Sequence, residues 1–237
     1  MRTLVVADVH ANLEAFEAVL AQAGSFDAIW SLGDIVGYGP DPVACMELLQ
    51  RYSHVAIAGN HDLAAAEGIG LEDFNPFAAA AARWTVGQLN PTEKVWLLGL
   101  PQVVVGDQDF TLVHGSLRDP IWGYLFTEPE AAEHLGAQET SYSLVGHTHV
   151  PMAFSHSSQE RLADGASLAL DGSRFVANPG SVGQPRDGDP RAAYAVIDTD
   201  ARRIDFHRVA YDVLATQAKM RRARLPEYLA ERLARGR

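Results

Sequence analysis

Three short apolar runs near the start of the chain each end in polar side chains that can bind metal ions. Residues 3–7, 28–32 and 55–58 are almost entirely apolar, which is typical of strands buried on both faces. The groups that follow them are two carboxylates, an amide and two imidazoles: Asp8, His10, Asp34, Asn60 and His61. Helical patterns separate the runs, so the order predicts parallel strands with right-handed crossovers. Because ligand sites gather at the carboxyl ends of such strands, we expect these groups to lie close together.

More imidazoles follow two later predicted strands. His114 comes directly after the apolar residues 110–113, and residues 144–145 lead into Gly146-His147-Thr148-His149. If this last segment leaves a strand, His147 and His149 point the same way, because side chains two residues apart share a face. Paired imidazoles are common transition-metal ligands. Taken alone, such a pair is weak support for a metal site, and the other strand ends strengthen it.

The remaining pattern predicts further helices and antiparallel strands. Helices are expected over residues 12–24, 43–51, 76–89, 91–99 and 128–135, with two more in 211–237 separated at Pro226. Strands are expected at 103–105, 110–113, 143–145, 152–154, 167–170, 174–176, 193–197 and 204–209, with a turn at Gly106-Asp107. A chain of 237 residues fits one large domain. We therefore expect a single domain over 1–237, with residues 201–237 forming a last hairpin strand and two helices packed on it.

The charge of the chain is unevenly distributed. The formal net charge is −11, composed of −17 in residues 1–200 and +6 in residues 201–237. An acidic body argues against binding extended nucleic acid, because phosphate backbones are held by basic surfaces. A small phosphate ester is still compatible, since bound divalent cations can reverse the local field. The basic cluster of Arg221, Arg222 and Arg224 is most simply a solvated helix face.

Cysteine content and hydropathy bear on location. One cysteine, Cys45, excludes an internal disulfide and fits a reducing cytoplasm. No apolar run approaches the length of a membrane span, and no signal-peptide pattern precedes the first strand. We therefore expect a cytoplasmic protein without membrane contact.

The polar groups at the strand ends suit a pair of divalent cations. A carboxylate can bridge two ions, and imidazole-rich sites favour borderline metals over calcium. Two ions about 3.5–4 Å apart would bind a bridging hydroxide and hold a phosphoryl group for in-line attack. No cysteine lies in any of these motifs, which excludes a thiolate site.

Five motifs in a fixed order resemble those of a known family. DxH, GDxxG, GNHD, VHG and GHTH, between residues 8 and 149, are similar to the motifs of the calcineurin-like metallophosphoesterase superfamily. GDIVGYGP, HGSLRDPIW and NPGSVGQPRDGDPR resemble its short bacterial and archaeal phosphodiesterase-like branch. The resemblance implies an α/β (mixed α+β) fold, a four-layer α-β-β-α sandwich, with a dinuclear metal site between loops at the sheet edges.

The resemblance also implies a role for each residue. Asp8, His10 and His149 would bind the first metal, Asp34 would bridge, and Asn60, His114 and His147 would bind the second. His61 would be the acid that stabilises or protonates the leaving oxygen, and Asn60 would also stabilise charge on the phosphoryl group. Manganese is the first expectation, with iron, zinc, cobalt, nickel or magnesium as alternatives.

One difference from the family's motifs narrows the class of substrate. The protein phosphatase branch carries an Asp-Arg pair where this chain has Gly37 and Tyr38, which argues against a protein phosphatase and against the protein-phosphatase-like dinucleoside polyphosphate hydrolases. Arg118 and Arg186 are then the candidates to bind the phosphate, since a guanidinium can hold it through two hydrogen bonds. For each, an ion pair with Asp119 or Asp187 is an equal alternative. Tyr38 could stack on a substrate ring, whereas Trp122 is expected to pack in the core.

Three functions are compatible with these residues. The first is hydrolysis of small phosphodiesters or phosphomonoesters by a hydroxide that bridges two metals, with a small phosphate ester or nucleotide as the partner molecule. The second is hydrolysis of dinucleoside polyphosphates or other nucleotides. The third is a non-catalytic protein-binding scaffold on the same fold, which the retention of all seven ligands and His61 argues against. A homo-oligomer could form through a hairpin edge or the C-terminal helices, but nothing in the sequence requires one.

Overall fold

The structure is a computed structural model that describes residues 1–106 and 109–237. Within these residues lie two six-stranded sheets, each mixing parallel and antiparallel pairs. The first sheet, in the order β3-β2-β1-β11-β12-β9, consists of β1 (Arg2–Val6), β2 (Ala28–Ser31), β3 (His54–Ala56), β9 (Ser167–Ala169), β11 (Ala192–Asp198) and β12 (Arg203–Val209). The second, in the order β4-β5-β6-β10-β7-β8, consists of β4 (Val103–Gly106), β5 (Phe110–Val113), β6 (Tyr142–Leu144), β7 (Met152–Ser155), β8 (Gln159–Arg161) and β10 (Phe175–Asn178).

The helices of the described residues are α1 (Leu13–Gln22), α2 (Pro42–Gln50), α3 (Asn60–Ala65), α4 (Pro76–Val86), α5 (Pro91–Leu98), α6 (Glu128–Ala137), α7 (Val213–Arg222) and α8 (Glu227–Leu233). Asn12 caps α1 as predicted, because its side-chain oxygen accepts a hydrogen bond from the Ala15 amide at 3.2 Å. Gly24, at φ +71°, follows the end of α1 in the left-handed conformation that glycine favours there.

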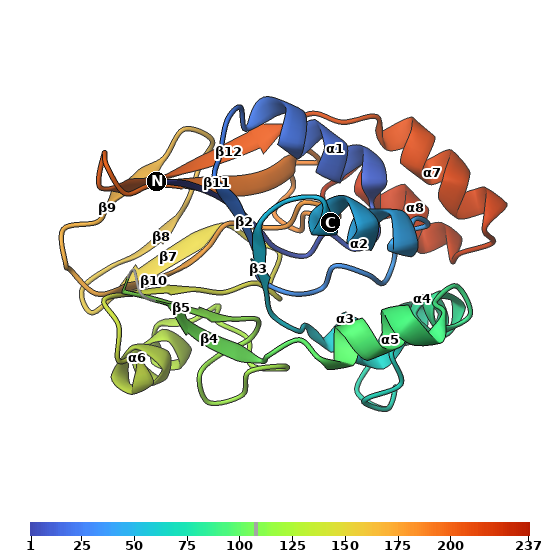
Figure 1. Ribbon diagram of the computed structural model, residues 1–237, viewed down its shortest axis with the longest axis horizontal. Helices are drawn as coiled ribbons and strands as arrows, with labels where there is room; N and C mark the ends of the chain where they lie inside the picture. Colours follow the sequence, from blue (N-terminus) through green and yellow to red (C-terminus); the bar gives the residue numbers. More distant parts are fainter. Residues whose placement is uncertain (107–108) are drawn as a thin grey trace.

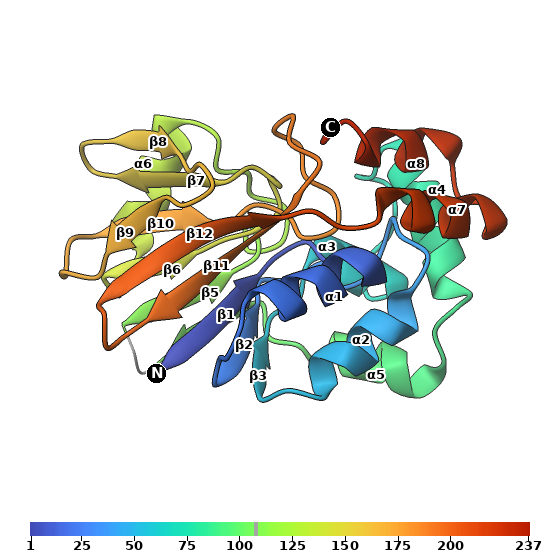
Figure 2. The ribbon, with the colours of Figure 1, turned by 90° about the horizontal axis from the view of Figure 1, so that it is seen from above.

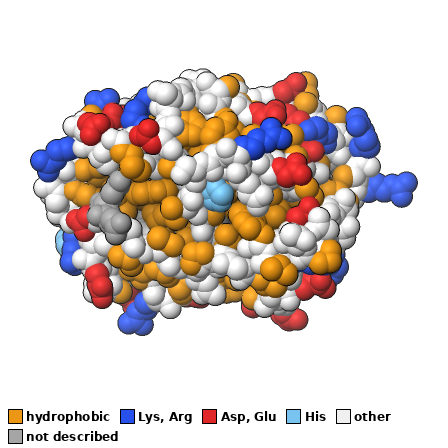
Figure 3. Space-filling model, viewed as in Figure 1, with side chains coloured by type: hydrophobic (Ala, Val, Ile, Leu, Met, Phe, Trp, Pro, Cys, Tyr) orange, Lys and Arg blue, Asp and Glu red, His pale blue; other side chains and the backbone are white. Residues whose placement is uncertain are grey.

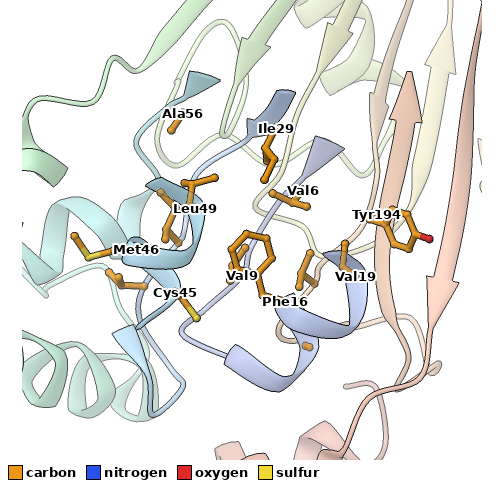
Figure 4. Close-up of a cluster of buried hydrophobic side chains, with 14 of the residues drawn as sticks. Val6, Val9, Phe16, Val19, Ile29, Cys45, Met46, Leu49, Ala56 and Tyr194 are labelled. Atoms are coloured by element: carbon orange, nitrogen blue, oxygen red, sulfur yellow. The ribbon is translucent and has the colours of Figure 1, made fainter. Parts of the chain in front are cut away.

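The two sheets and the helices outside them form four layers (Figure 1). Along β1, Leu4 packs in the core under α1 and α2, whereas Val5 packs in the core between the sheets. Figure 4 shows Val6 and Ile29 of the first sheet facing Phe16 of α1. On the other side, α6 covers the outer face of the second sheet. The predicted α-β-β-α sandwich is therefore confirmed, and burial on both faces explains the continuous apolar runs.

The parallel strands bring the predicted strand ends to one region. β1, β2 and β3 are parallel neighbours, with Val5 opposite Trp30 and Trp30 opposite Val55. In the second sheet, β5 and β6 are also parallel neighbours. The carboxyl ends of these strands, where the motif residues follow, thus lie at corresponding edges of the two packed sheets.

The structure differs from the prediction in three segments. β3 ends at Ala56 rather than residue 58, and the next residues lead into α3, a six-residue helix that was not predicted. Its start is fixed by Asp62, whose carboxylate accepts the Gly59 amide at 3.1 Å, a contact that hydrophobic periodicity does not reveal. β8 was also missed, because its residues are all exposed and show no alternation. Asp107, in the predicted turn, lies outside the described residues.

The C-terminal helices pack against the helices of the first half of the chain. Figure 2 shows α7 beside α1 and α8 beside α4. On α7, the ammonium of Lys219 binds both Glu14 of α1 and Asp41 before α2. Leu229 and Leu233 of α8 pack with Ala78 and Ala81 of α4. The break between α7 and α8 at Pro226 agrees with the prediction.

Acidic and basic side chains are mixed on the surface of the protein. On the face shown in Figure 3, basic side chains are interspersed with acidic ones, mostly toward the ends of the molecule.

Over residues 1–106 and 109–237, none of the helices has the length and apolar character needed to cross a membrane.

A buried histidine of α6 gives the fold a predictable sensitivity to acid. His134 accepts the Leu117 amide at Nδ1 (3.2 Å), so Nε2 carries the hydrogen and donates to Ser143 Oγ at 2.9 Å. Burial lowers the pKa of His134 to about 4. The unfolded chain takes up this proton below about pH 6.5, whereas the folded chain does not until about pH 4, so stability decreases as the pH falls between these values.

We expect His134→Asn, which keeps an acceptor for the Leu117 amide, to reduce this acid sensitivity. Between pH 7.5 and pH 5 the free energy of unfolding of the wild type should fall by about 2 kcal/mol more than that of the variant. Urea unfolding at the two pH values measures the difference. An equal fall in both proteins would mean that His134 does not cause the sensitivity.

Candidate metal centre

Seven side chains predicted as ligands lie together at the carboxyl ends of the strands. From the first sheet, Asp8 and His10 follow β1, Asp34 follows β2, and Asn60 begins α3 after β3. From the second sheet, His114 follows β5, and His147 and His149 follow β6. All seven are buried, with at most 4% of each residue's surface exposed. The site therefore draws on both sheets and cannot form from either one alone.

Most of these residues share an unfavourable backbone conformation. Five of the seven residues have positive φ angles although none is glycine: Asp8 (53°), His10 (49°), Asp34 (53°), His147 (65°) and His149 (60°). Such conformations cost free energy and persist where the surrounding structure enforces them, commonly at functional sites. The same residues supply the ligand atoms that lie close together, so the positive φ angles coincide with the candidate site.

The first cluster consists of Asp8, His10, Asp34 and His149. One ligand atom from each lies within 4.8 Å of the others. Nε2 of His10 lies 3.1 Å from Nε2 of His149 and 3.7 Å from Oδ2 of Asp34. Nε2 of His149 lies 3.3 Å from Oδ1 of Asp8. These atoms surround a small common space that a single cation would fit.

The second cluster shares Asp34 with the first. Its other members are His114 and His147, again with ligand atoms within 4.8 Å of one another. Nε2 of His114 lies 3.4 Å from Oδ2 of Asp34 and 3.3 Å from Oδ1 of Asn60. One carboxylate thus contributes to both clusters, as the predicted bridging role requires.

Backbone carbonyl groups set the orientation of three of the imidazoles. Nδ1 of His10, His114 and His149 donates to the carbonyl oxygens of Val36 (3.2 Å), Leu32 (2.8 Å) and Gln184 (2.6 Å), respectively. Because a carbonyl can only accept, each Nδ1 carries a hydrogen, and in the neutral ring Nε2 presents a lone pair to the cluster. Metal-binding histidines are commonly oriented in this way.

Buried ligand atoms that lack a suitable hydrogen-bond partner show whether divalent cations fit the site. With both Nδ1 atoms protonated, the neutral rings of His10 and His149 direct two lone pairs at each other, which is repulsive without a cation between them. Asp8 Oδ2 and His147 Nε2 are buried and have no hydrogen-bond partner among the described residues. Buried polar atoms without partners are costly, and one cation in each cluster would satisfy all four. The residues present therefore fit two divalent metal ions.

The pKa shifts of the ligand residues indicate that the site lacks positive charge. Burial raises the pKa of Asp8 to about 7 and lowers the pKa of His147 to about 3. Burial also opposes protonation of His114, but the carboxylate of Asp34 outweighs it and raises the pKa of His114 to about 9. Asp34 therefore favours a positive charge beside Nε2 of His114, and a metal ion would supply that charge.

A pocket of about 400 Å³ opens over the two clusters. It is lined by Asp34, Asn60, His61, His147 and His149 on the floor. Tyr38, Trp122 and Arg186 are also in its lining. Trp122 packs against the buried cluster of Ala58, Leu63 and Ile121 as predicted, and it contributes to the pocket as well. His61 lies with its ring centroid 4.3 Å from that of Tyr38, and its Nδ1 is buried without a hydrogen-bond partner in residues 1–106 and 109–237.

The two predicted phosphate-binding arginines are placed differently. Arg186 lies over the ring of Tyr38 at 5.8 Å and donates to its hydroxyl at 3.3 Å. The alternative ion pair with Asp187 does not form, because Asp187 pairs with Arg208. Arg118 is outside the pocket: its side chain is 71% exposed and lies 3.5 Å from Glu133 of α6. The structure thus brings Arg186 to the clusters and leaves Arg118 on the surface.

Sequence reasoning missed residues that support or line the site. Asp62 accepts the amides of Val36 and Gly59 at 3.0 and 3.1 Å, which ties the Asp34 loop to α3. Asn178 donates to the Gly146 carbonyl at 2.6 Å and so holds the loop that carries His147 and His149. The fourth residue of GNHD and the first of NPGS were the available signals. Phe74, Tyr228 and Arg232 also line the pocket, and no motif marks them.

Gly59 leaves no space for a side chain beside Asp34. A Cβ at this position would overlap the Asp34 carboxylate and lie 2.5 Å from the Asp34 amide nitrogen. We therefore expect Gly59→Ala to displace the shared carboxylate, reducing metal affinity and the activity that depends on the metals about 10²-fold or more.

Gly136→Ala is the matched control, because Gly136 lies in the last turn of α6 and a Cβ there meets no described atom within 4 Å. It should raise the free energy of unfolding by about 0.5–1 kcal/mol and leave activity unchanged. Calorimetric manganese titration and an activity assay compare the two variants. Wild-type metal affinity in Gly59→Ala would show that the position of Asp34 tolerates the added group.

With the geometry described, comparison with known proteins identifies the family. The sequence model of the calcineurin-like phosphoesterase superfamily domain matches residues 1–202. The chain belongs to this superfamily. The match ends before α7, so the C-terminal helices lie outside the part that the family model describes.

Individual relatives agree with this assignment. The crystal structure of a metallophosphoesterase from Sphaerobacter thermophilus has a TM-score of 0.92 and 47% identity, and the alignment covers 100% of this chain and 99% of that one. The uncharacterized protein MJ0912 of Methanocaldococcus jannaschii is 35% identical, over 98% of this chain and 97% of that protein. The phosphodiesterase YfcE of Escherichia coli is 28% identical, over 84% and 89%. The family and these names indicate a phosphoester hydrolase.

Proposed function

We propose that this chain hydrolyses small phosphodiesters or phosphomonoesters in a reaction that depends on two divalent metal ions. The observation that carries the proposal is the sharing of Asp34 between two buried ligand clusters at the floor of one pocket. The family supports the phosphoester class, and the phosphodiesterase YfcE among its relatives supports a diester preference.

In this proposal each ligand set holds one ion. Asp8, His10 and His149 would hold the first, and Asn60, His114 and His147 the second, with Asp34 between them. Two such ions would supply a water of lowered pKa as the nucleophile and Lewis acidity toward the phosphoryl oxygens. Manganese remains our first expectation for the metal, because imidazole and carboxylate ligands suit it and its neighbours in the first transition row.

The protein's own residues would bind and orient the substrate. Arg186 lies in the pocket without a carboxylate partner among the described residues, and its guanidinium would bind the phosphoryl oxygens. The amide of Asn60 would add a polar contact to the same group. Arg118 has no part in this proposal, since it lies outside the pocket.

His61 would assist departure of the leaving oxygen. Burial lowers the pKa of His61 to about 4, against the opposing charge of Asp34, so the free protein presents a neutral imidazole. A bound phosphate brings negative charge into the pocket, which raises the pKa of a neighbouring imidazole. His61 would then donate a hydrogen bond or a proton to the alcohol or phosphate that leaves.

The test compares three substrates with metal present and after chelation. Purified protein with added manganese should hydrolyse bis-p-nitrophenyl phosphate, and chelation should abolish turnover until manganese is restored. Rates with p-nitrophenyl phosphate and diadenosine tetraphosphate then distinguish diester, monoester and nucleotide hydrolysis. Chelator-resistant turnover would contradict metal dependence. No turnover with two metals bound would favour the non-catalytic scaffold.

Hydrolysis of dinucleoside polyphosphates is the second candidate, and the aromatic lining of the pocket favours it. Tyr38, Phe74, Trp122 and Tyr228 all line the pocket and offer surfaces on which a base could stack. Diadenosine tetraphosphate as the fastest of the three substrates would establish this alternative.

A further inference from the structure

One wall of the pocket comes from α8, a helix beyond the residues that the family model matches. Tyr228 and Arg232 of α8 are part of the pocket lining, together with the metal-cluster residues. The helix is held firmly against the rest of the chain. Leu229 packs in a core with α4, and Gln217 of α7 donates to the Ala230 carbonyl at 2.8 Å. The wall is therefore a built part of the pocket.

Two arginines in the lining pair with no Asp or Glu side chain of the described residues. Arg186 donates to the hydroxyl of Tyr38 and to Gln184, and its Nε is buried without a partner among these residues. Arg232 donates from Nε to the terminal carboxylate of Arg237, and its Nη atoms make no hydrogen bond to any described residue. Neighbouring arginines behave differently: Arg191 pairs with Asp189 at 2.7 Å, and Arg208 pairs with Asp187. In a chain of net charge −11, guanidinium groups with free donors in a pocket call for an explanation.

The two guanidinium groups line the same pocket at different positions. The backbone amide of Arg186 donates to the carbonyl oxygen of His149 at 3.3 Å, and its guanidinium lies over Tyr38, whose ring centroid is 4.6 Å from that of His10. Arg232 instead lies over Tyr228 of α8, and burial and the charge of Arg186 lower its pKa. Arg186 is therefore the inner cation, next to the clusters, and Arg232 is the outer one.

Aromatic rings position the outer cation. The guanidinium of Arg232 lies over the ring of Tyr228 at 5.6 Å. Tyr228 in turn stacks on Phe77 of α4, with ring centroids 4.8 Å apart. A guanidinium held over an aromatic ring keeps its hydrogen-bond donors free for a ligand. The pocket of about 400 Å³ falls within the roughly 300–1,000 Å³ of small-molecule sites, which leaves room for more than one phosphate.

We propose that Arg232 forms a second anion subsite beside Arg186, so that the preferred substrates carry a second phosphoryl group beyond the phosphate that is cleaved. Arg186 binds the phosphate at the metal clusters, and Arg232 binds the outer one. This specificity rests on the proposed phosphoesterase function. It assigns the substrate to phosphate esters with two phosphoryl groups joined by a short organic or phosphate chain.

Binding of flexible bisphosphonates tests the subsite without relying on turnover. Alkane bisphosphonates with linkers of three to six carbons are titrated calorimetrically into manganese-loaded protein, with propylphosphonate as the single-anion reference and a titration into manganese buffer as the blank. We expect one linker length to bind about tenfold or more tightly than propylphosphonate. Arg232→Met, which keeps the stem over Tyr228 but removes the charge, should reduce this preference to about twofold.

Two further variants complete the design. Arg232→Lys keeps a positive charge and should retain part of the preference, which separates charge loss from misfolding. Arg235→Met removes an exposed arginine of the same C-terminal segment outside the pocket, and should retain the full preference and the activity. Melting temperatures confirm that each variant is folded.

The outcomes separate this proposal from the proposed function. No preference at any linker length, or a preference that Arg232→Met retains, would overturn the second subsite. Turnover of bis-p-nitrophenyl phosphate without any bisphosphonate preference would remove the subsite alone. A preference lost in Arg232→Met, in a protein that hydrolyses no phosphate ester, would leave the subsite standing and remove the enzymatic function.

Discussion

Asp34→Asn is expected to abolish phosphoesterase activity, lowering kcat/KM by at least about 10³-fold, the equivalent of several kcal/mol of transition-state stabilisation. Oδ1 of Asp34 accepts the His61 amide at 2.8 Å, so the asparagine carbonyl would keep that position. Its NH2 group would then replace Oδ2, which lies 3.7 Å from Nε2 of His10 and 3.4 Å from Nε2 of His114. The variant thus directs hydrogens at the shared space of both clusters and removes the negative charge there.

Metal content shows whether this loss has the expected cause. Equilibrium dialysis with manganese should give two ions per chain for the wild type and fewer than two for Asp34→Asn. Asp205→Asn is the matched control, because Asp205 pairs with Arg203 on the surface of β12, away from the pocket. It should keep both the metal and the activity. Full metal content together with wild-type kcat/KM in Asp34→Asn would refute the shared-ligand assignment.

His61→Ala is expected to lower kcat by about 10²-fold or more while both metals stay bound. The His61 side chain faces the pocket and belongs to neither ligand cluster. If it assists the leaving oxygen, the loss should depend on that group. An alkyl phosphodiester, whose alkoxide leaves poorly without a proton, should lose more activity than bis-p-nitrophenyl phosphate, whose phenolate needs less help.

The leaving-group comparison distinguishes catalysis from a change in packing. The ring of His61 contacts Tyr38 and Phe74, so its removal could also loosen the pocket. A packing defect would lower the rates of both diesters by the same factor and raise KM. Phe74→Leu, which alters the same contacts, serves as the control for that effect. Equal losses for the two diesters in His61→Ala would show that His61 does not act on the leaving group.

Much of the candidate site could be predicted because its residues follow buried strands. The first three strands are covered on both faces, so their apolar runs stand out and their ends can be located to within two residues. Side-chain chemistry then identified the seven groups that the structure brings together. Parallel pairing within both sheets explains why groups as far apart in sequence as Asp8 and His149 meet.

The substrate-binding side chains were harder to predict, because their placement depends on tertiary packing. Arg118 and Arg186 lie in similar Pro- and Gly-rich loops, yet one loop directs its arginine toward Glu133 and the other into the pocket. In α8, the buried Leu229 and Leu233 show which face packs on the protein. They do not show that the neighbouring Arg232 faces a pocket formed largely by residues far away in the sequence, such as Asp34 and Trp122.

Anomalous diffraction from crystals grown with manganese is the most direct test of the dinuclear site. The account predicts two adjacent anomalous peaks at the floor of the pocket, one among Asp8, His10 and His149 and the other among Asn60, His114 and His147, with Asp34 contacting both. A single peak, or peaks elsewhere on the chain at full manganese occupancy, would contradict it.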